Sequence, residues 1–277
     1  MWRSVDFEAK TFFLGIGAQK AGTSWIRSYL ARRPDVYIAS GEMHFFDSRR
    51  SGNPRRRKRK MRARKRDLED GKSSALLDLK LDYLERKDAR SAYKEFFRSR
   101  VPEDTHVFGE ITPSYALVGK PGYRAVHEVF PNARVFFVMR DPAERLYSQR
   151  RMTRNRRQRR TGKEAGLSLD ELLNEAASDK RSLYQLTVRN LEAVFAREQI
   201  LYLFYEQLFQ PQTVEDLCKF LGLPYVAANF EEVVHPGGPR DEIPEEIDRE
   251  VRALFRATYR FCREKFGKRL PAEWRCP

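Results

Sequence analysis

The stretch that most constrains this chain runs from Phe12 to Leu30. An apolar run of strand length, FFLGI, leads into a glycine-punctuated turn, GAQKAGTS, and an amphipathic segment with Trp25 and Ile26 follows. The pattern predicts a strand, an anion-binding loop and a helix. Glycines let the backbone approach a ligand, the first helical amides point at it, and the helix dipole favours negative charge there. Lys20 would supply the countercharge to a bound anion.

The position of the lysine within this loop limits the kinds of anion that we predict the loop to bind. Nucleoside-triphosphatase loops put the lysine directly after the second glycine and before the hydroxyl. Here the lysine comes first, in the order Lys20, Ala21, Gly22, Thr23, Ser24. This order resembles the 5′-phosphosulfate loop of the sulfotransferase family, which binds 3′-phosphoadenosine 5′-phosphosulfate (PAPS). For the loop alone, the alternative is an ordinary strand-turn-helix with a solvated lysine.

A second candidate anion site follows the strongest predicted strand. The apolar run from Val135 to Met139 is typical of a strand covered on both faces in a parallel sheet. Arg140 would stand at the end of that strand and Ser148 in the next helix, where both can reach one phosphate. The segment VMRDPAERLYS resembles the sulfotransferase 3′-phosphate motif, with its arginine and serine at this spacing. The alternative is a surface Arg–Asp pair and a solvated serine.

Smaller segments resemble the same family. A tryptophan at the place of Trp25 stacks on adenine in cytosolic sulfotransferases, and helix packing is its alternative role. The segment YEQL, followed by FLGLP, resembles a family strand end and helix terminus, which makes Tyr205 a candidate adenine contact and leaves Glu206 a structural role. Arg240 lies where the family often has a basic loop over the 3′-phosphate.

The segment EMHFFD resembles the E-x-H-F-F-D segment of heparan sulfate 3-O-sulfotransferases and related bacterial enzymes. The resemblance implies that Glu42 is the catalytic base and that His44 and Asp47 are important beside it. A hydroxyl acceptor must lose its proton as it attacks sulfur, and a desolvated site would raise the pKa of Glu42 toward the working range. Histidine titrates near neutrality, so His44 is the alternative base. The alternative to a catalytic role is that His44 is a hydrogen-bonded core residue and Glu42 a charged residue of a surface loop.

One residue departs from that branch. Ile111, in the segment GEITPSY, stands where heparan-type enzymes carry a lysine near the acceptor. An apolar side chain cannot contact an anionic sugar. This substitution argues against a heparan-like acceptor.

The net charge of +15 is concentrated in two segments, at about 49–66 and 150–163. Residues 55–66 contain ten Lys/Arg, residues 150–160 contain seven arginines, and neither stretch contains an acid. We expect these segments to be solvated, mobile loops, with attraction to an anionic glycan or lipid surface as the next interpretation. Nucleic-acid binding is the least favoured, because neither segment has interleaved aromatic residues.

The whole chain fits one α/β domain over residues 1–277, since strands and helices alternate along most of its 277 residues. We expect a central, mainly parallel sheet flanked by helices, with one long C-terminal helix from Glu245 to Phe266. The three cysteines, Cys218, Cys262 and Cys276, have no paired or metal-ligand spacing, which favours a reducing compartment. No signal-peptide pattern or run of roughly 18 apolar residues is present, so we expect a cytoplasmic protein.

These features predict a PAPS-dependent sulfotransferase that acts on a hydroxyl of a carbohydrate, lipid-linked sugar or small metabolite. Adenosine 3′,5′-bisphosphate would leave as product, and no metal would be needed. The expected partner is the acceptor, with an anionic glycan or lipid-linked sugar among the candidates and peripheral membrane contact left open. A kinase-like enzyme would instead need a Walker-type lysine and magnesium ligands. A basic nucleic-acid-binding protein would depend on the arginine segments.

Overall fold

The computed structural model describes residues 7, 9–47, 59, 62–63, 81, 89–162, 168–232, 234 and 242–274. Its strands form one sheet in the order β2-β3-β1-β4-β5, and every neighbouring pair is parallel. The strands are β1 (Thr11–Gly15), β2 (Val36–Ile38), β3 (Val107–Ile111), β4 (Arg134–Met139) and β5 (Ile200–Phe204). The predicted α/β fold with a central parallel sheet is confirmed.

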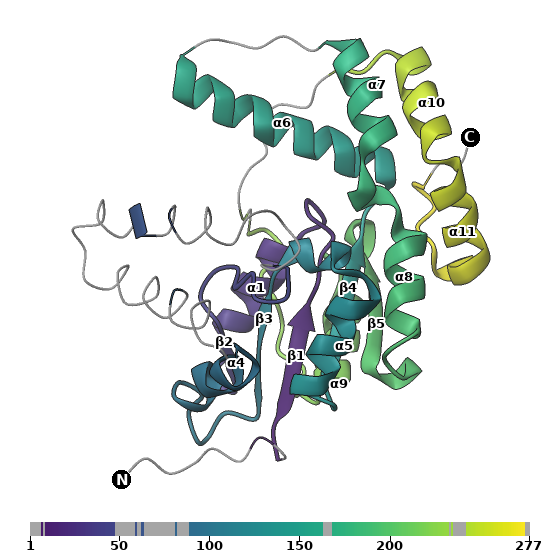
Figure 1. Ribbon diagram of the computed structural model, residues 1–277. Helices are drawn as coiled ribbons and strands as arrows, with labels where there is room; N and C mark the ends of the chain where they lie inside the picture. The colour runs from purple at the N-terminus through teal and green to yellow at the C-terminus, as the bar shows by residue number, and fades with distance from the viewer. Residues whose placement is uncertain are drawn as a thin grey trace.

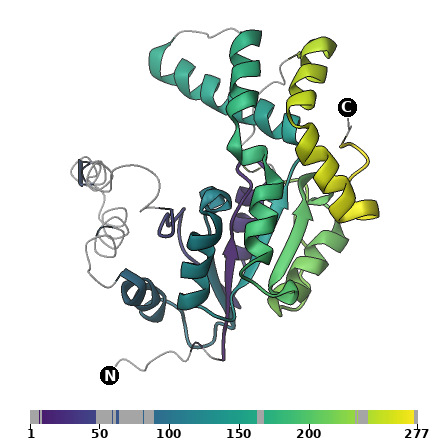
Figure 2. The same cartoon turned by 45° about the vertical axis from the view of Figure 1, so that its right-hand side comes forward.

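Helices connect and cover these strands. They are α1 (Thr23–Ala31), α4 (Ala89–Arg98), α5 (Gly119–Val129), α6 (Pro142–Thr161), α7 (Leu169–Ser178), α8 (Tyr184–Glu192), α9 (Pro211–Leu221), α10 (Glu245–Leu254) and α11 (Arg256–Phe266). The connections also contain short 3-10 helices: η1 (Pro113–Leu117), η2 (Lys180–Ser182), η3 (Arg197–Gln199), η4 (Tyr205–Gln207) and η5 (Gly267–Arg269). Figures 1 and 2 show α5 and α8 together over one face of the sheet.

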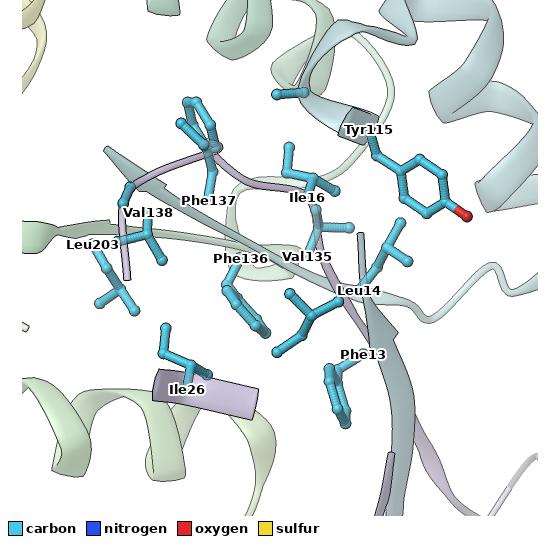
Figure 3. Packing of buried hydrophobic residues seen from close by; sticks show 14 of the residues in the cluster. Phe13, Leu14, Ile16, Ile26, Tyr115, Val135, Phe136, Phe137, Val138 and Leu203 are labelled. Atoms are coloured by element: carbon cyan, nitrogen blue, oxygen red, sulfur yellow. The ribbon is translucent and has the colours of Figure 1, made fainter. Parts of the chain in front are cut away.

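The central strands are buried on both faces, as a continuous apolar run requires. All five residues from Val135 to Met139 have an exposed fraction of 0%. In Figure 3, Ile26 of α1 lies on one side of the strands and Tyr115 of η1 on the other. The core is therefore two layers of side chains, one on each face of the sheet.

The order of the strands brings two loops together. β1 is flanked by β3 on one side and by β4 on the other, so the chain reverses its direction across the sheet at β1 and β4. The loop after β1 stays paired with β4 beyond the end of β1, where the Ala18 N–H donates to the Val138 carbonyl at 2.6 Å. In open parallel sheets, ligands bind at the carboxyl ends of the strands where such a reversal occurs.

The second basic segment differs from the expected mobile loop, because it is helical to Thr161 in α6. The N-cap Asp141 accepts a hydrogen bond from the Glu144 N–H at 3.1 Å. Farther along, Arg150 pairs with Glu171 and Glu175 of α7 at 3.0 and 3.2 Å. Capping and these half-buried ion pairs hold a helix that apolar periodicity alone did not indicate. Residue 163 and nearly all of 49–66 lie outside the described residues.

The long C-terminal helix that we expected is two helices, α10 and α11, which meet at Phe255. Phe255 is 1% exposed, and its N–H donates to the Arg252 carbonyl in a tight turn. Burial of this ring at the junction redirects the chain onto the core. None of the helices in the described part of the chain is long and apolar enough to span a membrane.

Candidate active site

The loop between β1 and α1 has the form expected for anion binding. Gly22 is the N-cap of α1 with φ 79°, and no side chain caps this helix. The first amides of α1 are therefore free of a side-chain acceptor. A Cβ on Gly22 would lie 2.4 Å from Leu208 Cδ2 and 3.1 Å from Tyr205 Cδ2. Only glycine fits here, because the loop packs closely on residues 205–208.

The side chains of this loop offer a cation and two hydroxyls. Lys20 is half-buried and has a left-handed φ of 74°. Thr23 and Ala21 are buried, whereas Ser24 is exposed. Burial, followed by the positive charge of Arg140, lowers the pKa of Lys20. An anion bound between these two cations would relieve their mutual repulsion.

Arg140 extends from the end of β4 to the same loop. Its Nη1 donates to the Lys20 carbonyl at 3.2 Å, and its Nη2 lies 3.3 Å from Glu144 Oε2. The guanidinium lies over the Tyr205 ring, 4.3 Å from the centroid. Its Nε is buried and has no hydrogen-bond partner among the residues that the structure describes. The side chain is thus fixed in orientation and retains a donor that a ligand could use.

A cavity of about 740 Å³ opens beside Arg140, and Arg151, Tyr205 and Arg252 are among its lining residues. Ser148 is 8% exposed in α6, and Arg151 follows three residues later with the same exposed fraction. Residues three apart on a helix lie on one face. Arg151 was not among the predicted site residues, although its spacing from Ser148 was the available signal.

The residues next to Arg140 connect it to the C-terminal helices. Asp141 is buried, pairs with Arg252 at 2.9 Å and accepts a hydrogen bond from the Tyr259 hydroxyl at 2.9 Å. Glu206 accepts hydrogen bonds from the Asp141 N–H at 2.9 Å and from Trp274 Nε1 at 3.0 Å. Glu206 therefore has the structural role predicted for it.

Trp25 lies in an aromatic cluster that also contains Tyr205. Its indole stacks on Tyr29 and Phe230, with ring centroids 6.1 and 5.9 Å apart, and meets Phe209 edge-on at 5.3 Å. Phe209 in turn contacts Tyr205 edge-on at 5.5 Å. Trp25 also borders a second cavity of about 390 Å³. Trp25 thus has the packing role considered for it, and stacking on adenine stays a prediction.

The three residues of the EMHFFD segment that we singled out form a chain of polar contacts. His44 Nε2 lies 3.0 Å from Glu42 Oε2, and His44 Nδ1 lies 2.9 Å from Asp47 Oδ2. The Ser114 hydroxyl donates to the same Asp47 oxygen at 2.5 Å. His44 has a left-handed φ of 57°, and its ring lies between the two carboxylates. In such an arrangement, a proton can be held at Glu42 or passed from Glu42 to the His44 imidazole.

The pKa of Glu42 is shifted opposite to our expectation. The hydrogen bond with His44 lowers it, and the positive charge of Arg27 lowers it further. Burial acts in the expected direction but is outweighed, because the Glu42 side chain remains 47% exposed. Arg27 is itself held at the ends of two strands, where it donates to the carbonyls of Ala39, at 2.7 Å, and of Ile111.

A buried carboxyl holds this segment against β3. Glu110 is 0% exposed and accepts hydrogen bonds from the hydroxyls of Tyr93, Thr112, at 2.6 Å, and Tyr115, at 3.0 Å. The Met43 N–H donates to Glu110 at 3.3 Å, and burial raises the pKa of this carboxyl. The sequence analysis did not identify this cluster, because its members are joined only by the fold.

The structure places Ile111 in the core. Its side chain is 1% exposed in β3, and its backbone carbonyl accepts a hydrogen bond from Arg27. Ile111 therefore supplies no cation for an anionic acceptor, and the expectation against a heparan-like acceptor stays a prediction. Arg240 lies outside the described residues, and within them no group of three or more His, Cys, Asp or Glu could hold a metal ion.

Comparison with known proteins shows the family and the fold of this chain. A model of the sulfotransferase family matches residues 13–227, a range that includes the loops carrying Lys20 and Arg140. The comparison with curated proteins found no match. Among solved structures, the chain is similar to a sulfotransferase from Alicyclobacillus acidocaldarius, with a TM-score of 0.65 and 21% identity over 96% of this chain and 99% of that one.

Two further solved structures share the fold. The sulfotransferase domain of the Synechococcus PCC 7002 olefin synthase has a TM-score of 0.53 and 15% identity over 95% of this chain and 98% of its own. The sulfotransferase domain from the curacin biosynthetic pathway has a TM-score of 0.51 and 17% identity over 78% of this chain and 75% of its own. The fold is therefore that of sulfotransferases, and the family match spans most of the sequence. The chain belongs to the sulfotransferase family.

Proposed function

We propose that this protein transfers the sulfuryl group of PAPS to a hydroxyl of an acceptor. The observation that carries the proposal is the contact of Arg140 with the loop of Lys20, where Nη1 donates to the Lys20 carbonyl at 3.2 Å. One nucleotide with phosphate groups at both its 3′ and 5′ ends would use both cations. A nucleotide with phosphates only at its 5′ end would leave Arg140 without a function.

The residues present fit such a nucleotide. Lys20 and the open amides at Gly22 would hold the 5′-phosphosulfate, with Thr23 and Ser24 near it. Arg140 has a buried donor without a described partner, and Ser148 lies beyond it in α6. Both would hold the 3′-phosphate, with Arg151 as a further cation in the same cavity. Trp25 and Tyr205 belong to one aromatic cluster and would contact the adenine.

Glu42 would act as the base in this reaction. The acceptor oxygen attacks sulfur in line, an oxygen–sulfur bond forms, and the bond from sulfur to the phosphate oxygen breaks. Glu42 receives the acceptor proton, and Lys20 stabilises the negative charge on the sulfuryl group and on the departing phosphate. The contact between Glu42 and His44, at 3.0 Å, would let His44 receive that proton in turn. This use of the EMHFFD segment is the one implied by the heparan-type branch of the family.

Titration of adenosine 3′,5′-bisphosphate tests the proposal. The unmodified protein should show one saturable site that binds this nucleotide more tightly than ATP. Lys20→Ala and Arg140→Ala should each weaken binding by about tenfold or more, since each removes a charged phosphate contact. A kinase would prefer ATP, and a nucleic-acid-binding protein would show no saturable nucleotide site. Absence of binding to the bisphosphate would overturn the proposal.

Glu42→Gln separates the base from the nucleotide site. This change keeps the shape of the side chain and removes its basicity, so turnover should fall about 100-fold or more. Affinity for adenosine 3′,5′-bisphosphate should stay within about twofold, because Glu42 lies outside the proposed nucleotide contacts. Near-normal turnover of Glu42→Gln would instead make His44 the base.

A further inference from the structure

The segment that follows β3 contacts both halves of the proposed site. We call it the bridge segment, residues 112–116. On one side, the Thr112 N–H donates to the Gly15 carbonyl at 2.8 Å, and the Ala116 N–H donates to the Ile16 carbonyl at 2.8 Å. These carbonyls belong to the last residue of β1 and to the residue after it. The bridge segment is therefore fixed to the strand end from which the loop between β1 and α1 begins.

On its other side, the bridge segment holds the backbone of the EMHFFD segment. The Met43 N–H donates to the Thr112 hydroxyl at 3.0 Å, and the Phe45 N–H donates to the Tyr115 hydroxyl at 2.7 Å. Thr112 and Tyr115 are both 0% exposed, so these hydrogen bonds are shielded from water. The two contacts lie one on each side of His44 and hold its left-handed backbone in place.

Glu110 orients both of these hydroxyls. A hydroxyl that accepts a hydrogen bond from an N–H still has one proton to donate. Thr112 donates its proton to Glu110 Oε2 at 2.6 Å, and Tyr115 donates its proton to Glu110 Oε1 at 3.0 Å. The two hydroxyl protons therefore point at the buried carboxyl, and the oxygen lone pairs remain for the N–H groups of the EMHFFD segment.

Ser114 of the bridge segment contacts the side chains of the EMHFFD segment. Its hydroxyl donates to Asp47 Oδ2 at 2.5 Å and lies 3.1 Å from His44 Nδ1. The other ring nitrogen of His44 lies 3.0 Å from Glu42 Oε2. The ring that contacts Glu42 is thus held by the bridge segment through both its backbone and its side chain.

We propose that Thr112 and Tyr115 are positioning residues for sulfuryl transfer, whose hydroxyls hold the EMHFFD segment at a fixed position relative to the loop of Lys20. This inference rests on the proposed function and adds two residues that act on the reaction through others. The base must reach the acceptor hydroxyl while Lys20 faces the sulfuryl group. Misplacement of a reacting group by about 1 Å can slow a reaction on the order of 100-fold.

A matched pair of variants separates positioning from stability. Tyr115→Phe and the control, Tyr93→Phe, each remove one fully buried hydroxyl that donates to Glu110 Oε1. Both variants keep the aromatic ring and the net charge. We therefore expect similar decreases in the urea midpoint of unfolding. The Tyr115 hydroxyl additionally accepts the Phe45 N–H, so Tyr115→Phe should also change the base.

The first measurement is the pKa of Glu42, from a carbon-13 NMR titration without nucleotide. Among the described residues, the charged groups that act on this carboxylate are His44 and Asp47 of its own segment and Arg27 of α1. The hydrogen bond with His44 contributes most to the lowered pKa. Release of His44 in Tyr115→Phe should weaken that bond and raise the pKa of Glu42 toward its ordinary value. The control variant should leave this pKa unchanged.

The second measurement is transfer of sulfur-35 from labelled PAPS to a fractionated extract of the native cell. Tyr115→Phe should transfer the label about tenfold more slowly or worse, and the control should stay within about twofold. Affinity for adenosine 3′,5′-bisphosphate should stay within about twofold in both variants, because both residues lie outside the proposed nucleotide contacts.

Thr112→Val tests the second hydroxyl independently of whether Tyr115→Phe folds. This change keeps the shape of the side chain and removes one acceptor of the Met43 N–H, which retains Glu110 at 3.3 Å. The pKa of Glu42 should again rise, and transfer should fall by about threefold or more.

An unchanged pKa of Glu42 and unchanged transfer in Tyr115→Phe, or in Thr112→Val if Tyr115→Phe does not fold, would overturn the inference. Equal effects in the control would also overturn it, because the changes would then follow from the loss of any buried hydroxyl at Glu110. In both cases intact binding of the bisphosphate would leave the proposed function standing. Failure of the unmodified protein to bind the bisphosphate would overturn the proposed function and this inference with it.

Discussion

Among the residues that the structure describes, two non-glycine residues have a left-handed backbone, and both are candidate catalytic residues. Lys20 has φ 74° and His44 has φ 57°. Such conformations cost on the order of 1–3 kcal/mol and persist where the surrounding structure enforces them. At Lys20 the Arg140 guanidinium holds the carbonyl, and at His44 the ring is held by Asp47. Both strained residues thus belong to segments that the proposed reaction uses.

The charge of Arg27 predicts a pH effect on the base. Because its positive charge lowers the pKa of Glu42, replacing it should raise that pKa. Glu42 would then be protonated, and unable to accept a proton, up to a higher pH. In a carbon-13 NMR titration of Glu42, Arg27→Met should therefore titrate at higher pH than the unmodified protein. Arg32→Met is the control, since Arg32 follows α1 directly and pairs with Glu232. An unchanged or lowered pKa in Arg27→Met would contradict this account.

Glu110 predicts a stability effect on the segment that carries the base. Glu110→Ala would remove the acceptor of the Tyr93, Thr112 and Tyr115 hydroxyls and one of the two acceptors of the Met43 N–H, at a cost of about 2–4 kcal/mol in the free energy of unfolding. Urea denaturation measures this change. Glu128→Ala breaks a surface pair with Arg90 and should cost at most about 0.5 kcal/mol. Equal stability of the two variants would contradict the role of Glu110 in holding this segment against β3.

At the residue scale, the sequence could predict site residues that lie in one segment, but not those whose partners lie on other elements. Glu42, His44 and Asp47 lie within one segment, so a local motif could identify them together. Glu110 and Arg27 act through partners on other elements, such as Tyr93 and Ile111. No spacing in the sequence encodes those contacts.

At the scale of elements, the loop between β1 and α1 requires glycine at position 22 for two separate reasons. One is the left-handed backbone of Gly22, and the other is the lack of space for a Cβ. Gly22 and Gly222 both have left-handed backbones, with φ 79° and 76°. A Cβ at Gly22 would clash with Leu208 at 2.4 Å, whereas at Gly222 it would meet Arg134 Nη1 at an ordinary 3.5 Å. Both alanine variants should lose about 1 kcal/mol from backbone strain.

The clash at Gly22 should appear in ligand binding. In calorimetric titrations, Gly22→Ala should weaken affinity for adenosine 3′,5′-bisphosphate by about tenfold or more, because the loop must move away from Leu208. Gly222→Ala should bind as the unmodified protein does. Equal affinity of the two variants would show that the loop geometry does not matter for the nucleotide.

Most elements were predictable because their signals are local. The strand of Val135–Met139 and the loop of Lys20 follow from apolar runs and glycines. The basic end of α6 was not, because its helix depends on ion pairs between Arg150 and α7. The break at Phe255 was missed for a similar reason, since an apolar residue fits a helical pattern and a buried turn equally well.

At the scale of the molecule, the parallel sheet explains why two distant motifs form one site. Lys20 and Arg140 are 120 residues apart, yet the pairing of β1 with β4 places the loops that follow them side by side. The fold class was predictable from the alternation of strands and helices. The strand order was not, because no local pattern states which strands pair.

The central claim is that Glu42 and Lys20 serve one sulfuryl transfer, Glu42 as the base for the acceptor hydroxyl and Lys20 at the sulfuryl group and the departing phosphate. Its most direct test is incubation of the protein with sulfur-35-labelled PAPS and a fractionated extract of its native cell. The unmodified protein should move the label to an acceptor and release adenosine 3′,5′-bisphosphate in equal amount. Glu42→Gln should bind the bisphosphate and transfer no label above background. Bisphosphate binding without transfer by the unmodified protein, or transfer at its rate by Glu42→Gln, would contradict the account.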